Sequence, residues 1–153
     1  MKIVVTGGAG FIASNITDAY IERGHEVHIL DDFSTGQRSN VNAQATLHQI
    51  DIADRQSSKL IEQIKPDVLS HHAAQMDVRH SVADPTFDAR VNILGFINLL
   101  EGCKNAGVKK VIFASSGGAV YGEQEIFPAS ESHATQPASP YGVSKRAGEL
   151  YLS

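Results

Sequence analysis

The sequence has little that would stabilise it covalently or attract a charged partner. It contains no tryptophan and a single cysteine, Cys103, so an internal disulfide is excluded. Cys103 lies in an apolar helical stretch and is predicted to be a buried core thiol. Acidic residues outnumber basic ones by 17 to 13, and a formal net charge of −4 gives no electrostatic basis for binding nucleic acid or an anionic membrane.

Long hydrophobic runs are also lacking. No apolar stretch reaches the length of a membrane span, and a predicted strand from Lys2 leaves no room for a signal peptide. We therefore expect a soluble cytoplasmic protein. With 42% apolar and 20% charged residues, the chain has the composition of a globular domain and not of a disordered segment. Its 153 residues are enough for one domain with a sizeable core.

The hydrophobic pattern predicts strands that alternate with helices. The predicted strands are Lys2–Val5, His25–Leu30, Thr46–Ile50, Val68–His72 and Lys110–Ala114. Four helices are predicted. The first follows the glycines at 7–10, and the second starts after an Asp54 cap. The third runs from Asp84-Pro85 to about Asn105, and the fourth starts at Ser139-Pro140. Residues 34–45 and 123–139 are predicted loops. This order predicts an α/β fold with a doubly wound parallel sheet of the Rossmann type.

The glycine turn after the first strand is the first candidate site. Gly8-x-Gly10-x-x-Ala13 fits the dinucleotide-binding pattern, and Gly7-x-x-Gly10-x-x-Ala13 fits a related spacing. Glycines let the backbone approach a pyrophosphate, and the N–H groups and dipole of the following helix attract its charge. An ordinary glycine-rich turn remains the alternative.

An acidic pair, Asp31-Asp32, ends the second strand about twenty residues after this turn. A carboxylate there accepts hydrogen bonds from the ribose hydroxyls and repels a 2′-phosphate, which favours NAD over NADP. Acidic pairs are also common in plain loops. However, ligands of parallel α/β sheets bind beyond the carboxyl ends of the strands. Polar or small residues follow every one of these predicted strand ends: the glycine turn, Asp31-Asp32, Asp51-Ile52, Ala73-Ala74-Gln75 and Ser115-Ser116.

Tyr141 and Lys145 are the candidate chemical groups. They are four residues apart on a predicted helix and therefore share one face. A neighbouring ammonium stabilises a phenolate and lowers its pKa, which would make the tyrosine a useful general base. Ser116 is placed to hold the substrate oxygen. Tyr-x-x-x-Lys also occurs by chance on many helices.

These motifs together resemble the N-terminal part of the extended short-chain dehydrogenase/reductase (NAD-dependent epimerase/dehydratase) family, most of all its UDP-glucose 4-epimerases. The runs that carry the resemblance are VTGGAGFI at 5–12, LDDFSTG at 30–36, HAAQ at 72–75, NILG at 92–95, SSGGAVYG at 115–122 and SPYGVSK at 139–145. They extend over nearly the whole chain. The resemblance implies that residues 1–153 form an NAD-binding Rossmann domain that stops before the family's C-terminal strands and substrate domain.

The resemblance also implies the cofactor contacts. Phe11 and Ile12 would lie at the pyrophosphate. Asp31 and Asp32 would lie at the adenosine ribose. The remaining cofactor-binding residues implied are Gly7, Gly10, Ser34, Thr35 and Gly36, then Asp51 and Ile52 at the adenine, and Ala73, Ala74, Gln75, Asn92, Tyr141 and Lys145 toward the nicotinamide.

The implied catalytic triad is Ser116, Tyr141 and Lys145, with Ser115 as the alternative if Gly117-Gly118 shifts the register. The implied reaction is a transient oxidation: Tyr141 takes the proton of the sugar 4-hydroxyl while C4 gives a hydride to NAD, and the 4-keto sugar is reduced on its other face. Dehydratase and decarboxylase branches add an acidic residue after the Ser/Thr, and Gly117-Gly118 stands there instead, which favours an epimerase. The resemblance further implies a UDP-hexose substrate and a homodimer built in part from the catalytic helix. The alternatives are a catalytically silent NAD-binding module and another nucleotide-sugar epimerase or dehydratase of the same family.

The seven histidines do not suggest a metal site. His25 and His28 fall on opposite faces of a predicted strand, and the adjacent His71 and His72 also diverge. No metal is expected.

Overall fold

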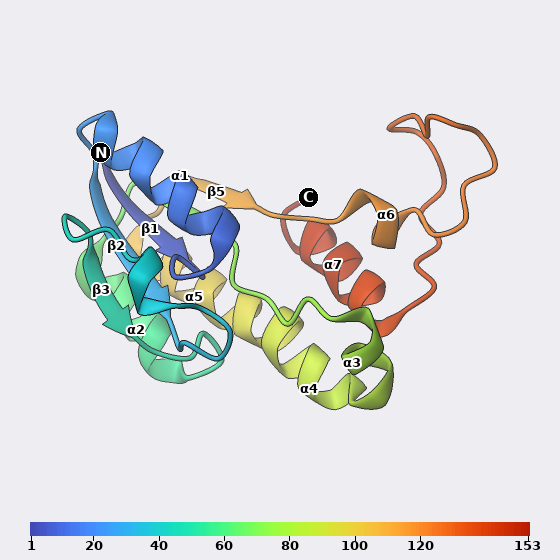
Figure 1. Ribbon diagram of the computed structural model, residues 1–153, viewed down its shortest axis with the longest axis horizontal. Helices are drawn as coiled ribbons and strands as arrows, with labels where there is room; N and C mark the ends of the chain where they lie inside the picture. Colours follow the sequence, from blue (N-terminus) through green and yellow to red (C-terminus); the bar gives the residue numbers. More distant parts are fainter. The chain divides into compact units, whose positions relative to one another are not determined.

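The computed structural model describes residues 1–153 (Figure 1). Its strands are β1 (Lys2–Thr6), β2 (Glu26–Asp31), β3 (Thr46–Gln49), β4 (Val68–His71) and β5 (Lys110–Phe113). Its helices are α1 (Phe11–Glu22), α2 (Arg55–Ile64), α3 (Val78–Ala83), α4 (Pro85–Ala89), α5 (Phe96–Ala106), α6 (Gly117–Val120) and α7 (Pro140–Tyr151), with a 3₁₀ turn η1 (Arg38–Asn40) and a π-helical segment η2 (Arg90–Gly95).

The chain forms two compact units. The first comprises residues 1–74 and 95–114, and the second comprises residues 75–94 and 115–153. The first unit contains the sheet, α1, α2 and α5. The second contains α3, α4, α6 and α7.

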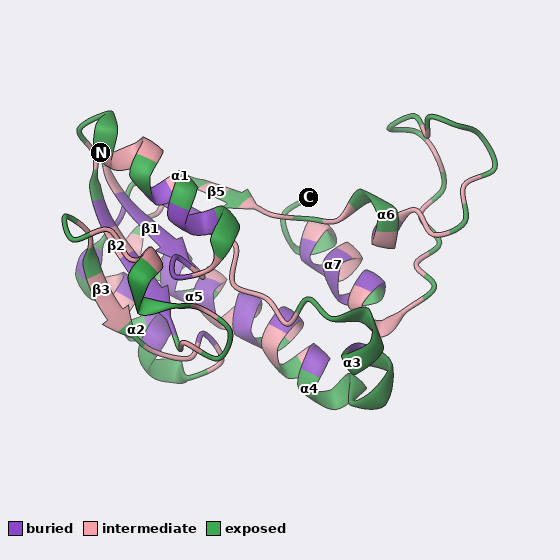
Figure 2. Cartoon of the chain, in the orientation of Figure 1, coloured by how far each residue is buried: buried purple, intermediate pink, exposed green.

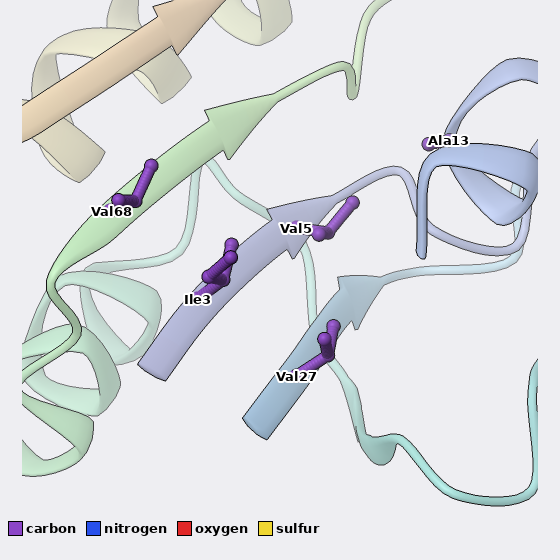
Figure 3. Packing of buried hydrophobic residues seen from close by; sticks show 5 residues of the cluster. All are labelled: Ile3, Val5, Ala13, Val27 and Val68. Atoms are coloured by element: carbon purple, nitrogen blue, oxygen red, sulfur yellow. The ribbon is translucent and has the colours of Figure 1, made fainter. Parts of the chain in front are cut away.

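In the first unit, five parallel strands lie in the order β3-β2-β1-β4-β5. The sheet is covered on both faces, because alternate residues of β1 meet different helices. On one face Ile3 and Val5 pack with Val27, Val68 and Ala13 of α1 (Figure 3). The doubly wound Rossmann fold expected from the sequence is confirmed.

On the other face, Thr6 is paired in register with His71, and the His71 ring stacks on Phe96 of α5 with ring centroids 4.7 Å apart. Helix α2 packs beside α5, where a Cβ at Gly102 would come within 2.6 Å of the Ser58 carbonyl oxygen. Figure 2 shows buried residues in β1 and β2, and all four residues of β4 are buried as well. Cys103 of α5 is also buried, as expected, and burial raises the pKa of its thiol to about 12.

In the second unit, two separate stretches of chain are joined by hydrogen bonds. The Tyr141 amide at the start of α7 donates to Ser81 Oγ of α3 at 3.2 Å, and Ser144 Oγ donates to Asp88 Oδ2 of α4 at 2.6 Å. Both contacted residues, Ser81 and Asp88, are fully buried. Residues 121–139 contain no helix or strand, as predicted for the loop.

The helix predicted from Asp84-Pro85 to about Asn105 is not one regular α-helix. It starts as expected, with Asp84 accepting from the Phe87 amide, but the π-helical segment η2 separates α4 from α5. Two short helices, α3 and α6, were not predicted. None of the helices is long and apolar enough to span a membrane.

Candidate functional site

The turn between β1 and α1 accepts only glycine at its first positions. Gly7 has a φ of +71°, and its amide donates to the Leu30 carbonyl at 2.8 Å. A Cβ on Gly7 would come within 2.8 Å of the Ala73 backbone nitrogen, and one on Gly8 within 2.7 Å of Ile29. The Gly10 amide donates to the Gly7 carbonyl at 2.9 Å, which closes the turn. The backbone at the end of β1 is therefore tightly bent and packed closely against Ala73 and Ile29.

Helix α1 begins at this turn without a side-chain cap. Gly10 occupies the N-cap position, whereas Asp54 and Ser139 cap the first turns of α2 and α7. The first-turn N–H groups of a helix have no partner within the helix, and together with its dipole they favour an anion. Phe11 and Ile12 lie beside them and are 83% and 66% exposed despite being apolar. The arrangement suits a pyrophosphate covered by apolar side chains.

The Asp31 carboxylate is buried and stabilises the loops around it. Its Oδ2 accepts from the Ala9 amide at 2.9 Å, and its Oδ1 accepts from the Phe33 amide at 2.8 Å. Each carboxylate oxygen keeps a further lone pair for a ribose hydroxyl. Asp32 is exposed, and its Oδ1 accepts from the amide and hydroxyl of Ser34.

Residues 36–40 lie against the glycine turn. The Ala9 carbonyl accepts from the Gln37 amide and from Asn40 Nδ2, both at 3.0 Å. A Cβ on Gly36 would come within 2.7 Å of the Ala9 Cβ, so this position also needs glycine. Ser34 and Thr35 are exposed beside it. The turn and the segment after β2 therefore form one connected surface.

The other predicted residues of the first unit also follow strand ends. Asp51 Oδ1 accepts from the Ala53 amide at 2.8 Å, and Ile52 is buried. The Ala73 amide donates to Thr6 Oγ1 at 3.1 Å, which holds the start of the segment after β4 against the end of β1. Ala73 and Ala74 are half-buried. The structure thus brings the segments that follow β1, β2 and β4 together at the carboxyl ends of these strands.

In the second unit, Tyr141 and Lys145 share one face of α7. The helix starts where predicted, because Ser139 Oγ accepts from the Gly142 amide and Pro140 occupies the first turn. Lys145 Nζ lies 5.8 Å from the centre of the Tyr141 ring. Lys145 is only 5% exposed, which is unusual for a lysine, and Tyr141 is half-buried.

Burial shifts the pKa values of both groups. It lowers the pKa of Lys145 to about 8, although the Asp88 carboxylate acts in the opposite direction. Burial also raises the pKa of Tyr141, a shift opposed by a hydrogen bond with Ser116 and increased by Asp88. The sequence-based expectation of a lowered tyrosine pKa is therefore wrong for this structure, because desolvation, with the Asp88 carboxylate, raises the pKa of Tyr141 more than the Ser116 hydrogen bond lowers it.

The two candidate serines differ in their partners. Ser116 hydrogen-bonds with Tyr141, whereas Ser115 Oγ donates to Glu149 Oε1 at 2.6 Å. Both line a cavity of about 500 Å³, together with residues of α6, α7 and the loop between them. The hydrogen bonding favours Ser116 over Ser115 as the partner of the tyrosine.

Gln75 and Asn92 form a closed hydrogen-bonded pair. Asn92 Oδ1 accepts from the Gln75 amide at 3.0 Å, and Asn92 Nδ2 donates to the Gln75 carbonyl at 2.8 Å. Both side chains also donate to Oδ1 of the buried Asp88, Gln75 at 3.0 Å and Asn92 at 2.9 Å. Sequence reasoning missed Asp88. Its position four residues before Asn92, on the helix that Asp84-Pro85 starts, was the available signal.

The parallel sheet, the glycine turn and the acidic end of β2 define a dinucleotide-binding protein of the Rossmann class. The model of the NAD dependent epimerase/dehydratase family matches residues 3–153. The chain belongs to this family.

Several members of known identity are similar to the chain. A UDP-glucose 4-epimerase of Mycolicibacterium smegmatis is 44% identical over all of this chain and 50% of its own length. The structure of the Thermotoga maritima UDP-glucose 4-epimerase with UDP-glucose superposes with a TM-score of 0.97, at 42% identity, over 99% of this chain and 50% of that one. The Thermus thermophilus UDP-glucose 4-epimerase in complex with NAD gives a TM-score of 0.95, at 45% identity, over the same shares. The chain spans about half the length of the relatives it matches.

Proposed function

We propose that this chain binds NAD and supplies the proton-transfer group of a UDP-hexose 4-epimerase. The observation that carries the proposal is a nearly buried lysine one helical turn from a half-buried tyrosine that hydrogen-bonds with Ser116. The pair occurs in a chain of the epimerase/dehydratase family, and relatives of this chain are UDP-glucose 4-epimerases. Residues 1–153 would be the NAD-binding domain of such an enzyme.

The residues of the first unit fit the cofactor. Side chains at Gly7 and Gly8 would collide with Ala73 and Ile29, which explains a bare backbone at the turn, and the uncapped start of α1 suits a pyrophosphate. Residues 31–36 would hold the adenosine ribose, and Asp51 and Ile52 the adenine. NAD, when bound, accepts a hydride from the sugar and returns it.

The residues of the second unit would handle the proton. At neutral pH the raised pKa of Tyr141 keeps it a neutral phenol, and Lys145, with a pKa of about 8, is mostly an ammonium. The minor phenolate form of Tyr141 would take the proton of the sugar 4-hydroxyl; the hydrogen bond with Ser116 favours this form, and the Lys145 ammonium on the same helix face would favour it as well. In the second unit, Lys145 would also bind the nicotinamide ribose, and Gln75 and Asn92 would lie near the nicotinamide.

Two binding experiments and one substitution test the proposal. Calorimetry should show NAD binding tighter than NADP, because Asp31 and Asp32 repel a 2′-phosphate; tighter NADP binding would refute the role of these acids. In a version extended to the length of the relatives, Tyr141→Phe should lower the epimerisation rate about 10²–10⁴-fold and leave NAD affinity unchanged. Tyr151→Phe, on the exposed end of the same helix, is the matched control and should be fully active.

Retained turnover in the Tyr141→Phe variant would remove this residue from the mechanism. NAD binding with no epimerisation in the extended protein would instead identify a catalytically silent NAD-binding module.

We also propose that α7 contributes to a homodimer. Val143, Ala147 and Leu150 form a stripe along one side of the helix, and Val143 and Leu150 are 50% and 57% exposed. Burying such a stripe against a second copy removes apolar area from water. Sedimentation velocity should give a dimer and Leu150→Glu a monomer; a monomeric unsubstituted protein would refute this interface.

A further inference from the structure

Asp88 is a fully buried carboxylate that the proposed reaction does not use. It lies in α4, and its two oxygens serve different parts of the second unit. Oδ1 accepts from Gln75 Nε2 at 3.0 Å and from Asn92 Nδ2 at 2.9 Å. Oδ2 accepts from Ser144 Oγ of α7 at 2.6 Å. One side chain thus joins the Gln75–Asn92 pair to the catalytic helix.

The energetic cost of this arrangement calls for an explanation. A buried carboxylate is costly unless hydrogen bonds or a cation compensate it. The three hydrogen-bond donors to Asp88 are neutral, and the cation that interacts with it is the ammonium of Lys145. Ser144 lies immediately before Lys145 and three residues after Tyr141, so the 2.6 Å hydrogen bond fixes the stretch of α7 that carries both groups. An apolar residue at position 88 would fill space but could not order three polar side chains.

We propose that Asp88 is a positioning residue that holds the Gln75–Asn92 pair and the Tyr141–Lys145 pair in one fixed arrangement. Its catalytic consequence depends on the proposed function, but the arrangement itself does not. The negative charge has a second effect, which supports the proposal: Asp88 favours the ammonium form of Lys145 and the neutral form of Tyr141. The carboxylate therefore holds the proton-transfer groups in place and also biases their protonation, on which burial has the larger effect.

Asp88→Asn separates charge from shape. The asparagine Oδ1 can accept from Gln75 and Asn92, and its Nδ2 can donate to Ser144 Oγ, because a hydroxyl also accepts. All three hydrogen bonds then survive and the charge is lost. Ser144→Ala does the opposite: it removes the bond to α7 and keeps the charge. Asp84→Asn is the matched control, since it removes a carboxylate at the start of the same helix and keeps a capping side chain.

The first measurement is the titration of Lys145 in this chain by NMR of ¹³C,¹⁵N-labelled lysine, with the resonance assigned by its loss in Lys145→Arg. The midpoint, expected at about 8, should fall by one pH unit or more in Asp88→Asn. It should stay within a few tenths of a unit in Asp84→Asn. An unchanged midpoint in folded Asp88→Asn would overturn the electrostatic role.

The second measurement is turnover in the extended protein. Ser144→Ala should lower kcat at least tenfold, with NAD affinity and KM changed less than threefold, because it removes the bond that positions α7. Asp88→Asn keeps that bond, so it should lower kcat through the lost charge alone. If Asp88→Asn does not fold, Ser144→Ala decides: a wild-type kcat there would overturn the positioning role. If the Lys145 midpoint moves but Tyr141→Phe remains active, the proposed function fails and the assignment of Asp88 as the residue that controls Lys145 stands.

Discussion

Replacing Gly7 by alanine tests the reasoning about the glycine turn most directly. Gly7 has a φ of +71°, and a Cβ there would lie 2.8 Å from the backbone nitrogen and 2.9 Å from the Cα of Ala73. Gly24, after α1, has a φ of +76° but no atom within 4 Å of an added Cβ. Both substitutions force a left-handed backbone on an L-residue, and only the first also creates a clash. Gly24→Ala is therefore the matched control.

The expected magnitudes follow from these two terms. A left-handed conformation costs an L-residue about 1–2 kcal/mol. Forcing extra atoms into a packed site costs about 1–3 kcal/mol more, and here the neighbour is backbone that cannot rotate away. Gly24→Ala should thus lower the free energy of unfolding by about 1–2 kcal/mol and Gly7→Ala by about 2–5 kcal/mol. The gain from a stiffer unfolded chain is the same in both and cancels in the difference.

The assay is urea unfolding followed by circular dichroism, combined with NAD titration of each folded variant. Gly7→Ala should also weaken NAD binding, since relieving the contact with Ala73 moves the turn, whereas Gly24→Ala should bind like the unsubstituted protein. Equal losses of stability in the two variants, within about 0.5 kcal/mol, would show that the close approach of Gly7 to Ala73 is not a constraint.

Two further predictions concern titratable side chains. Burial is the main cause, and the charge of His28 the second, of a pKa of His48 that lies below 6.5. The folded state therefore favours neutral His48. The contribution of His48 to stability is full above pH 6.5 and decreases as the pH falls below that value. His48→Gln should accordingly lose less stability than the unsubstituted protein between about pH 7 and pH 5 in urea titrations, and parallel curves would contradict this. The Cys103 thiol, with its pKa raised to about 12 by burial, should react with iodoacetamide at about pH 8 at least a hundredfold more slowly in the folded than in the unfolded chain; equal rates, measured by mass spectrometry, would contradict its burial.

Local signals in the sequence predicted much of the fold. Asp54 and Ser139 cap α2 and α7 as expected, because a helix start depends on a few neighbouring residues. Each strand was placed within one residue of its observed ends. The buried strand β1 reads as a short apolar run, as buried parallel strands do. The family resemblance is confirmed.

The features that sequence reasoning missed depend on distant contacts. The π-helical segment lies where Asn92 bonds both the amide and carbonyl of Gln75, and no periodicity of residues 85–105 reveals that pairing. The raised pKa of Tyr141 arises from burial and from Asp88, 53 positions earlier in the chain. The four-residue spacing of Tyr141 and Lys145 showed that the two are neighbours, but it could not show that burial and Asp88 raise the pKa of Tyr141.

The two backbone hydrogen bonds of Asp31 have a consequence for engineering cofactor preference. Replacing the carboxylate to admit a 2′-phosphate would also remove the partner of the Ala9 amide in the glycine turn and that of the Phe33 amide. A buried amide left without a partner costs about 1–3 kcal/mol. A single substitution of Asp31 therefore destabilises the fold at the same time as it relaxes the preference for NAD over NADP. Any evolutionary or laboratory route to NADP use has to begin at the exposed Asp32, or restore those two acceptors first.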